Sequence, residues 1–286
     1  MFGNNRRMTT LPVSPMLLHS TDDPPASADW IHQVKFDGVR CVMANVDGAI
    51  GLWSRHGTPC TRQFPEFQSL RRPQSVILDG ELIVVSSGWT DFDAEMERFM
   101  AKKEHKIARL ASTTPAHFVA FDILSINGDS VMSRPLRERQ ALLSSVAEPS
   151  DVISVCQSFD DGQALFESTR QLGWEGVVSK RLESPYRPGM RSNDWLKAKH
   201  YTVAQMDVVA GRREPYGLLV EQNGQAVGVV ELVPASVRRE VRLRMSVSQV
   251  TDRWIYAHAP VTVEVRYTRT TKKGKLRDAY VVRVVD

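Results

Sequence analysis

Cysteine is scarce in this sequence of 286 residues. Only Cys41, Cys60 and Cys156 are present, far apart in the chain. An odd number of widely spaced cysteines fits neither a disulfide framework nor a zinc cluster. The small disulfide-stapled secreted proteins and the zinc modules are therefore excluded, and a reducing cytoplasm is the expected location.

Long hydrophobic runs are also missing. No stretch approaches the ~20 apolar residues that a membrane-spanning helix requires, and no signal peptide is seen before Met8. Internal repeats and low-complexity tracts are likewise absent. With 42% hydrophobic and 24% charged residues, the composition is typical of a globular protein with one or two domains.

The net charge of +4 is distributed unevenly. Residues 201–286 contain 3 Lys and 11 Arg against 4 Asp and 5 Glu, a net charge of +5, so the first 200 residues carry −1. A basic C-terminal part on a nearly neutral body is typical of proteins that bind a polyanion. Ordinary solvated surface charge accounts for the composition equally well.

One short stretch, Lys35-Phe-Asp-Gly-Val-Arg40, combines a lysine, an Asp-Gly pair and an arginine. The alternation of Trp30, His32 and Val34 before it predicts a strand, which the Asp-Gly pair ends. A lysine at that position can point into a cleft and act as a nucleophile. Free lysine titrates near ~10.4, so such an amine has to lose its proton first. The alternative is a plain hairpin whose lysine and arginine are solvated.

Periodicity and turn signals predict mixed α and β structure, with little regular structure in residues 1–28. In the first 200 residues we expect strands at 40–45, 49–54, 117–124 and 175–180, a strand pair at 76–78 and 81–85 around an Asp-Gly turn, and helices at 92–100, 135–143 and 160–172. After residue 200 we expect strands at 206–211, 218–221, 226–233, 261–267 and 280–285, and a helix at 235–244. Five strands and one helix are typical of a small Greek-key barrel of the OB type.

Further motifs follow the Lys35 stretch in a fixed order. They are Ser54-Arg-His-Gly57, Leu78-Asp-Gly-Glu-Leu82, Phe118-Val-Ala-Phe-Asp-Ile-Leu124, Glu175-Gly-Val-Val-Ser-Lys180 and Asp194-Trp-Leu-Lys-Ala-Lys199. In this order they resemble the covalent nucleotidyltransferases, which comprise DNA ligases, RNA ligases and capping enzymes. With the run Asp91–Met100, the chain is most similar to the small ATP-dependent DNA ligases of bacteria and phages, over residues 11 to 286.

This resemblance implies the fold and the reaction. The fold is α+β: a nucleotidyltransferase (adenylation) domain of antiparallel sheets with flanking helices at 1–200, then a C-terminal OB-fold barrel at 201–286. The implied reaction attaches AMP from ATP to Lys35, passes it to a DNA 5′-phosphate, and seals the nick with release of AMP. Mg²⁺ or Mn²⁺, nicked duplex DNA, no membrane and a monomeric state are implied with it. The barrel is implied to assist the attack on ATP and then to face the nick.

The resemblance also implies roles for individual residues. The catalytic set is Lys35, Asp37, Lys197 and Lys199. The ATP- and AMP-binding set is Gln33, Val34, Lys35, Arg40, Arg55, Glu81, Phe121, Glu175, Lys180, Lys197 and Lys199. Glu81 and Glu175 are the implied metal ligands, each expected at a strand end, and two carboxylates suffice for Mg²⁺. Phe121 is implied to stack on the purine. By residue type alone, each of these glutamates is an ordinary solvated side chain, Phe121 and Trp195 are core residues, and His56 has no catalytic task.

Two positions depart from the family pattern. A glutamate is common two residues before the nucleophile, where this chain has Gln33. Its amide can still accept a hydrogen bond from the adenine amine. The family's final Arg-x-Asp-Lys motif is matched only by Arg283, because the chain ends Arg-Val-Val-Asp.

DNA contacts are expected on the basic barrel and beside the nucleophile. The predicted DNA-binding residues are Arg40, Arg212, Arg213, Arg238, Arg239, Lys272, Lys273, Lys275, Arg277 and Arg283, with Arg242 and Arg244 as further phosphate contacts. Two other functions use the same features. An RNA ligase or capping guanylyltransferase would share Lys35, Glu81 and Glu175. A catalytically idle basic DNA-binding protein would not need them. NAD⁺ as the nucleotide donor is disfavoured, since that branch has an additional N-terminal domain.

Overall fold

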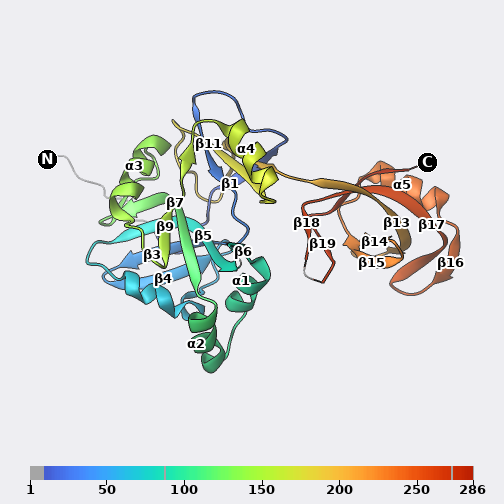
Figure 1. Cartoon of the computed structure of the whole chain (residues 1–286), viewed down its shortest axis with the longest axis horizontal. Helices are drawn as coiled ribbons and strands as arrows, with labels where there is room; N and C mark the ends of the chain where they lie inside the picture. The colour runs from blue at the N-terminus through green and yellow to red at the C-terminus, as the bar shows by residue number, and fades with distance from the viewer. Residues whose placement is uncertain (1–9, 87, 272, 286) are drawn as a thin grey trace. The chain divides into compact units, whose positions relative to one another are not determined.

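The computed structural model describes residues 10–86, 88–271 and 273–285. The chain divides into two compact units, the first ending at Lys199 and the second beginning at His200 (Figure 1). Among the described residues, no helix is both long and apolar enough to cross a bilayer.

The first unit contains two β-sheets. The larger has the strand order β4-β3-β5-β7-β8, with β6 on β5 and β9 on β7, and all its pairings are antiparallel except β7–β9. Its strands are β3 (Val39–Val46), β4 (Ala49–Ser54), β5 (Val76–Ser86), β6 (Trp89–Thr90), β7 (Ala116–Ile126), β8 (Asp129–Ser130) and β9 (Ile153–Val155). The central strands β5 and β7 are buried over most of their length. Their successive side chains enter different hydrophobic clusters, so both faces of the sheet are covered.

The smaller sheet has the order β1-β12-β11-β2-β10. Its strands are β1 (Leu17–Thr21), β2 (Trp30–Val34), β10 (Ser158–Phe159), β11 (Gly176–Arg181) and β12 (Arg191–Lys199). β1 runs parallel to β12, and the remaining pairs are antiparallel. The chain therefore passes from the smaller to the larger sheet at Asp37-Gly38, between β2 and β3.

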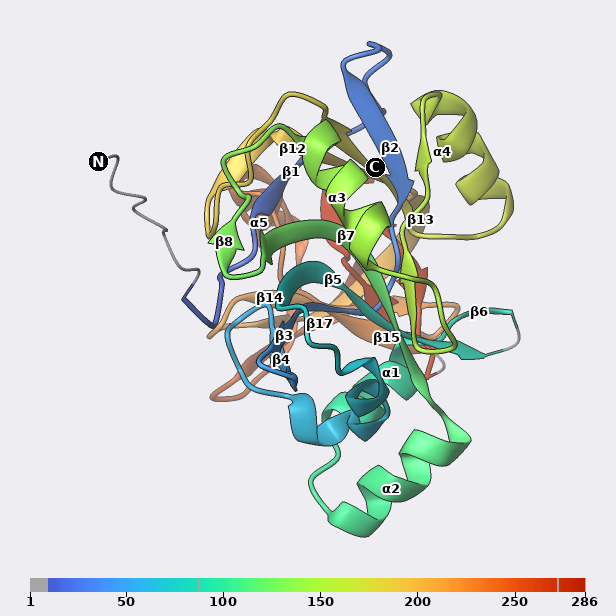
Figure 2. The same ribbon diagram turned by 90° about the vertical axis from the view of Figure 1, so that its left-hand side faces the viewer.

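Helices cover the sheets of the first unit. They are α1 (Phe92–Phe99), α2 (Glu104–Thr113), α3 (Leu136–Val146) and α4 (Gly162–Gln171), with 3₁₀ turns η1 (Thr61–Gln63) and η2 (Pro65–Leu70). Asp91 and Asp161 cap α1 and α4: the carboxylate of each accepts a hydrogen bond from the backbone amide three residues later, that of Ala94 and of Ala164. α3 packs on β7, while α4 packs on β2 and β11 (Figure 2).

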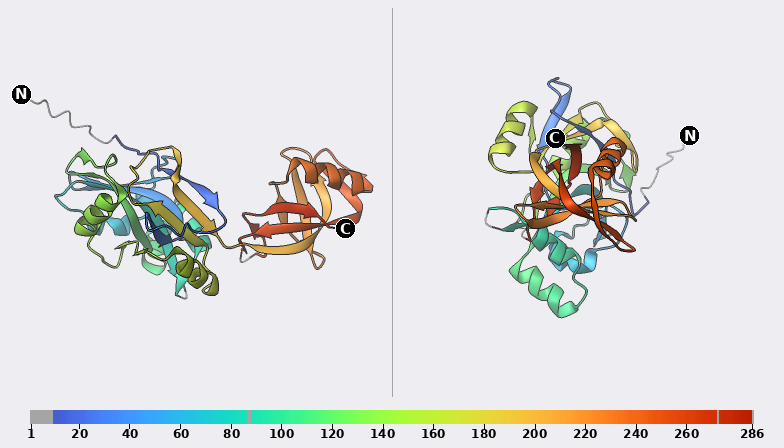
Figure 3. Two further views of the ribbon diagram at one scale, coloured as in Figure 1. Left: turned by 90° about the horizontal axis from the view of Figure 1, so that it is seen from above. Right: turned by 90° about the vertical axis from the view of Figure 1, so that its right-hand side faces the viewer.

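The described part of the second unit contains a six-stranded sheet, a separate two-stranded sheet and one helix. Its strands are β13 (Thr202–Arg212), β14 (Gly217–Gln222), β15 (Gln225–Val230), β16 (Val247–Val250), β17 (Trp254–Tyr267), β18 (Arg269–Thr270), β19 (Leu276–Arg277) and β20 (Tyr280–Val284). The order in the six-stranded sheet is β15-β14-β13-β17-β16, with β20 on β17, and β18 pairs with β19 in the two-stranded sheet. Helix α5 (Ala235–Arg244), the orange helix in Figure 3, packs on β20. A core of mainly valines fills the interior.

Most predicted elements are present, but four expectations were wrong. Residues 76–86 form one continuous strand, not a pair around Asp79-Gly80. The pair is typical of a turn, but here a Cβ on Gly80 would lie 2.4 Å from the Phe118 ring, and Asp79 is fully buried. The segments around Asp37-Gly38 lie in different sheets, so the hairpin alternative is also wrong. β1 lies within the stretch expected to be irregular, and helix α2 was not predicted.

Candidate functional site

Two lysines and a glutamate meet where three neighbouring strands of the smaller sheet end. The strand register pairs Val34 with Val177 and Gly176 with Lys199, so Lys35, Glu175 and Lys199 lie at adjacent strand ends. The Lys35 amide donates to the Gly176 carbonyl at 2.9 Å. The Glu175 carboxylate bridges the two lysines: Oε2 lies 2.7 Å from Lys35 Nζ and Oε1 lies 2.6 Å from Lys199 Nζ.

This group is only slightly exposed. The side chains of Lys35, Glu175 and Lys199 are 21%, 13% and 11% exposed. Burial opposes ionisation of Glu175, but the two ammonium groups outweigh it and lower the carboxyl pKa. Burial, together with the ammonium groups of Lys199 and Lys35, lowers the pKa of Lys197. The group is therefore a small cationic cluster with one shared carboxylate.

Two glycines allow the backbones to approach closely here. Gly176 has φ +143°, and a Cβ on it would lie 2.1 Å from the Ala198 carbonyl oxygen. A Cβ on Gly38 would lie 2.1 Å from the Leu82 carbonyl oxygen and 3.0 Å from Glu81 Cγ. Neither position tolerates a side chain without backbone movement, so both glycines are required by packing.

Glu81 faces the same group from the larger sheet. It lies within β5, where it pairs with Arg40 and Val119, and not at a strand end as expected. Burial raises its pKa to about 8; Lys35 and Arg40 lower the value and Glu175 raises it. Lys35 and both predicted metal carboxylates therefore lie close enough to influence one another's ionisation.

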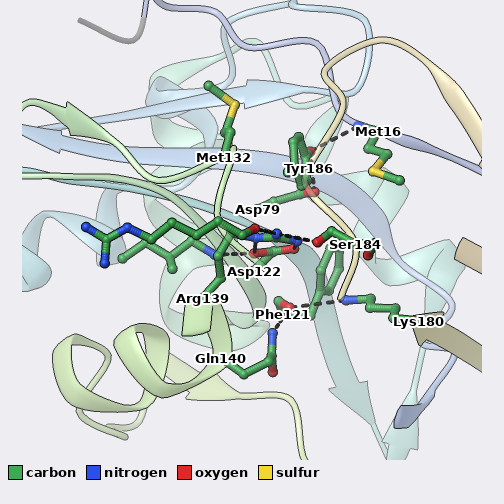
Figure 4. Close-up of polar contacts among 12 residues, drawn as sticks. Met16, Asp79, Phe121, Asp122, Met132, Arg139, Gln140, Lys180, Ser184 and Tyr186 are labelled. Carbon is green, nitrogen blue, oxygen red and sulfur yellow. Dashed lines mark hydrogen bonds and ion pairs between the residues drawn. The ribbon is translucent and has the colours of Figure 1, made fainter. Parts of the chain in front are cut away.

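A buried polar network supports the larger sheet beneath this site (Figure 4). Arg40 donates to both oxygens of Asp79, at 3.1 Å and 2.7 Å, and the Tyr186 hydroxyl donates to Asp79 Oδ2 at 2.7 Å. Arg139 makes a fully buried two-bond pair with Asp122, at 2.8 Å and 2.9 Å. No local signal in the sequence indicates Tyr186, Asp122 or Arg139 as supports of the site, because only the fold brings these distant positions together.

Lys180 lies in an aromatic niche. Its Nζ donates to the Phe121 carbonyl at 3.1 Å and lies 4.3 Å and 4.2 Å from the ring centroids of Phe121 and Trp195 (Figure 4). Burial, partly offset by Asp122, lowers the Lys180 pKa to about 8. Trp195 is buried, consistent with a core anchor, whereas Phe121 is only partly buried.

The chain is similar to known proteins. A family profile described as "ATP dependent DNA ligase domain" matches residues 15–199. The SPbeta prophage-derived DNA ligase-like protein LigB of Bacillus subtilis is 33% identical over 93% of this chain and 96% of its own length. DNA ligase C of Mycobacterium tuberculosis is 33% identical over 80% of this chain and 69% of that protein. The chain belongs to the ATP-dependent DNA ligases.

Solved structures agree with the ligase assignment. Mycobacterial DNA ligase D complexed with ATP and MES matches 96% of this chain and 95% of that one, with a TM-score of 0.60 and 25% identity. A Lig E DNA ligase matches at a TM-score of 0.66 and 20% identity, which concerns the fold. The predicted α+β nucleotidyltransferase-type ligase fold and ATP as the nucleotide are therefore confirmed. Members of this family act through a lysyl-AMP intermediate.

The structure places four further predicted site residues of the ligase in different surroundings. Gln33 is buried, and its amide nitrogen donates to Ser158 Oγ at 3.1 Å and to Gln140 Oε1 at 3.4 Å. The Val34 side chain packs with the hydrophobic cluster under α4, so only its backbone is available to a nucleotide. Arg55 is exposed just after β4. Asp37 is partly buried in the crossing between the sheets.

The predicted DNA contacts of the ligase fall into paired and exposed groups. Arg40 is only 11% exposed and is held by Asp79, so this arrangement gives no support to its DNA contact. Ion pairs join Arg212 to Glu231 and Arg283 to Glu264. The exposed members are Arg213, Arg239, Lys273 and Lys275, while Arg238 and Arg277 are partly buried. Lys272 lies outside the described residues.

Proposed function

We propose that this ligase seals nicks in duplex DNA and that Lys35 is the residue that carries AMP. The observation that supports this most directly is the Glu175 carboxylate, which lies between Lys35 and Lys199 at hydrogen-bond distance from both. Lys35 Nζ attacks the α-phosphorus of ATP and pyrophosphate leaves. AMP then passes to a DNA 5′-phosphate, and a 3′-hydroxyl displaces it.

Each step is an in-line displacement at phosphorus, which is catalysed mainly by position and charge. Glu175 Oε2, 2.7 Å from Lys35 Nζ, is placed to take the proton that the ammonium has to lose before it attacks. Lys199 and Lys197 alternate on β12 and face the same side as Lys35. We assign them to the charge that develops on the α-phosphate. Asp37, in the crossing before Gly38, orders the approach of β3 to β5.

The donor set fits a divalent cation of the Mg²⁺ class. Glu81 is a carboxylate whose pKa burial raises to about 8, and the neighbouring Glu175 adds to that rise. The protein alone therefore compensates the negative charge of Glu81 poorly, and a bound cation would supply the missing positive charge. We infer that Glu81 and Glu175 hold Mg²⁺ or Mn²⁺, since such ions take one or two carboxylates and complete their shell with phosphates and water. When bound, the ion neutralises phosphate charge.

The adenosine is proposed to bind beside Phe121. Lys180 and Gln140 both donate to the Phe121 carbonyl and so fix this part of β7. Gln33 is joined to the same group through Gln140. With its NH₂ engaged by Ser158 and Gln140, its amide oxygen is the atom that we assign to the adenine amine. Arg55 is assigned to the ribose or phosphate.

We propose that the second unit is an OB-type barrel that binds the DNA. β13 pairs with both β14 and β17, β17 pairs with β20, and a parallel bridge between Leu232 and Tyr280 brings the chain after β15 beside β20. These contacts support a closed five-stranded arrangement with α5 between its third and fourth strands. Its net charge of +5 supports a polyanionic partner.

The proposal is tested by labelling the protein with α-³²P-ATP and separating it by denaturing electrophoresis. The wild-type chain should form a labelled covalent adduct with ATP but not with GTP, and the adduct should disappear when nicked DNA is added. Lys35→Ala should give no adduct, while Lys102→Ala, a change at an exposed surface lysine, should label normally. Labelling of the Lys35→Ala protein, or a preference for GTP, would refute the proposed function.

A further inference from the structure

A column of three aromatic rings stands next to the Lys35–Glu175–Lys199 group. The rings of Trp89 and Trp174 are stacked, with centroids 3.8 Å apart and planes inclined by 6°. Phe36 also stacks with Trp89, with ring centroids 6.5 Å apart and planes inclined by 23°. All three residues are only partly buried, and none of them carries a role in the reaction described above.

The column is attached to both halves of the site. Trp89 belongs to β6, which pairs with β5, the strand that carries Glu81. Phe36 directly follows Lys35 and packs with Ile83 and Val119 of the larger sheet. Trp174 directly precedes Glu175, just before β11 of the smaller sheet. The Trp89–Trp174 contact therefore joins the strand of one carboxylate to the turn of the other.

The Trp174 turn is held tightly at its two ends. The Trp174 amide donates to the Thr169 carbonyl at 2.8 Å, and Gly173 before it has φ +70°, as is common where a helix ends. On the other side, the Gly176 carbonyl accepts from the Lys35 amide. Between these fixed points lie the Trp174 ring and the peptide that carries Glu175.

We propose that the Trp89–Trp174 stack is a positioning clamp that keeps the Glu175 carboxylate between Lys35 and Lys199. The stack touches no reacting atom; it acts through the peptide that it holds. A displacement of about 1 Å of a catalytic group can lower a rate roughly 100-fold. Loss of the stack should therefore slow AMP transfer to Lys35 more than it weakens ATP binding. This inference rests on the proposed function of Lys35.

The test compares replacements of Trp89 that keep or remove a flat ring. Trp89→Phe retains a stacking surface, whereas Trp89→Leu keeps apolar volume without one. We expect Trp89→Phe to form lysyl-AMP within about 3-fold of the wild-type rate, and Trp89→Leu to be about 10- to 100-fold slower with a KM for ATP within about 3-fold. Trp174→Leu should behave like Trp89→Leu, and the double replacement should slow the reaction no more than either alone.

Two further measurements separate positioning from general damage. Stacked indoles give an exciton couplet in circular dichroism, which should be lost in all the Trp89 and Trp174 variants and retained in Trp254→Ala, a change on β17 of the second unit. Thermal unfolding identifies any variant that fails to fold, and Trp89→Phe is the conservative replacement that remains informative. Leucine variants that lack the couplet but form lysyl-AMP at the wild-type rate would overturn the clamp. An unlabelled wild-type protein would instead overturn the proposed function.

Discussion

Glu175 is the central residue of the site, because its two carboxylate oxygens contact two different lysines. Glu175→Gln keeps the shape but removes the negative charge and the proton acceptor. We expect lysyl-AMP formation to fall by about 100-fold or more. Thermal stability should also fall somewhat, because the substitution removes both ion pairs of a mostly buried carboxylate. Rapid-quench labelling with ATP measures this rate. Glu183→Gln, at an exposed glutamate paired with Arg137, is the control that should retain activity.

A second carboxylate, Glu95, affects stability and not chemistry. It is fully buried in α1, and neither of its oxygens has a hydrogen-bond partner within the described part of the chain. Burial raises its pKa from 4.5 to about 7, partly offset by Arg98. Because the folded protein binds this proton more tightly than the unfolded chain, Glu95 stabilises the folded state fully below pH 4.5. That contribution is lost as the pH rises through about 7.

Glu95→Gln should remove this pH dependence. The free energy of unfolding of the wild type should fall between about pH 5 and pH 8. The fall in the variant should be smaller, by up to roughly 3 kcal/mol. Urea unfolding of both proteins at the two pH values measures the difference. Glu138→Gln removes a carboxylate at an exposed helical position and should not produce this effect. Parallel pH profiles for the wild type and Glu95→Gln would show that the buried carboxylate is not the cause.

The sequence predicted which residues gather at the candidate site better than it predicted the residues that support them. Lys35, Glu81, Glu175 and Lys199 lie in short, recognisable motifs, and the structure brings them together. Pairs such as Asp122–Arg139 and Asp79–Tyr186 join positions 17 and 107 residues apart. Nothing in local composition indicates such pairs, because a buried ion pair is specified only once the fold has placed both partners.

At the scale of elements, glycines next to the motif residues determine how closely neighbouring strands approach. Gly38 is the clearest case, because a Cβ there would lie 2.1 Å from the Leu82 carbonyl of β5. Gly38→Ala should destabilise the protein by about 1–3 kcal/mol. It should also slow lysyl-AMP formation, since β3 is pushed away from the strand that carries Glu81. Gly211→Ala on β13, where a new Cβ would come no closer than 4.0 Å to the Leu218 side chain, is the matched control for thermal unfolding and labelling.

Elements were predicted well where periodicity was strong and poorly where packing overrides local signals. The helix predicted at 235–244 is α5 itself, with the same bounds. The Asp-Gly pair of β5 was interpreted as a turn. The strand instead continues through it, and the absence of a side chain at Gly80 leaves room for the Phe118 ring. β1 was missed because its five residues LLHST do not alternate, and it is stabilised by pairing with the distant β12.

At the scale of the whole molecule, charge is the feature that separates the two units. The relatives LigB and DNA ligase C match most of this chain, so the ligase assignment concerns both parts of the sequence. The +5 of residues 201–286 contrasts with −1 before it. Several of these charges are neutralised within the unit, as in the pairs of Arg212 with Glu231 and of Arg283 with Glu264. The exposed lysines near β19 are the better candidates for contact with DNA.

Lys273 and Lys275 provide the test of this surface. Both are exposed, and Lys275 Nζ donates to the Ala226 carbonyl of the neighbouring β15. Reversal of both to glutamate should weaken binding to nicked duplex DNA. The slope of log K against log salt should become shallower by roughly 0.9 for every DNA phosphate that the protein no longer neutralises. Lysyl-AMP formation should change much less, because Lys35, Glu175 and Lys199 belong to the first unit.

Fluorescence anisotropy across a salt series measures this slope, with Lys102→Glu in the first unit as the control. Lys102 is an exposed lysine, so its reversal changes the net charge by the same amount per residue without altering the second unit. An unchanged affinity and slope in the Lys273 and Lys275 double variant would mean that another face of the second unit binds the DNA. The exposed Arg213 and Arg239 would then be the next residues to reverse, because they carry unburied positive charge elsewhere in the same unit.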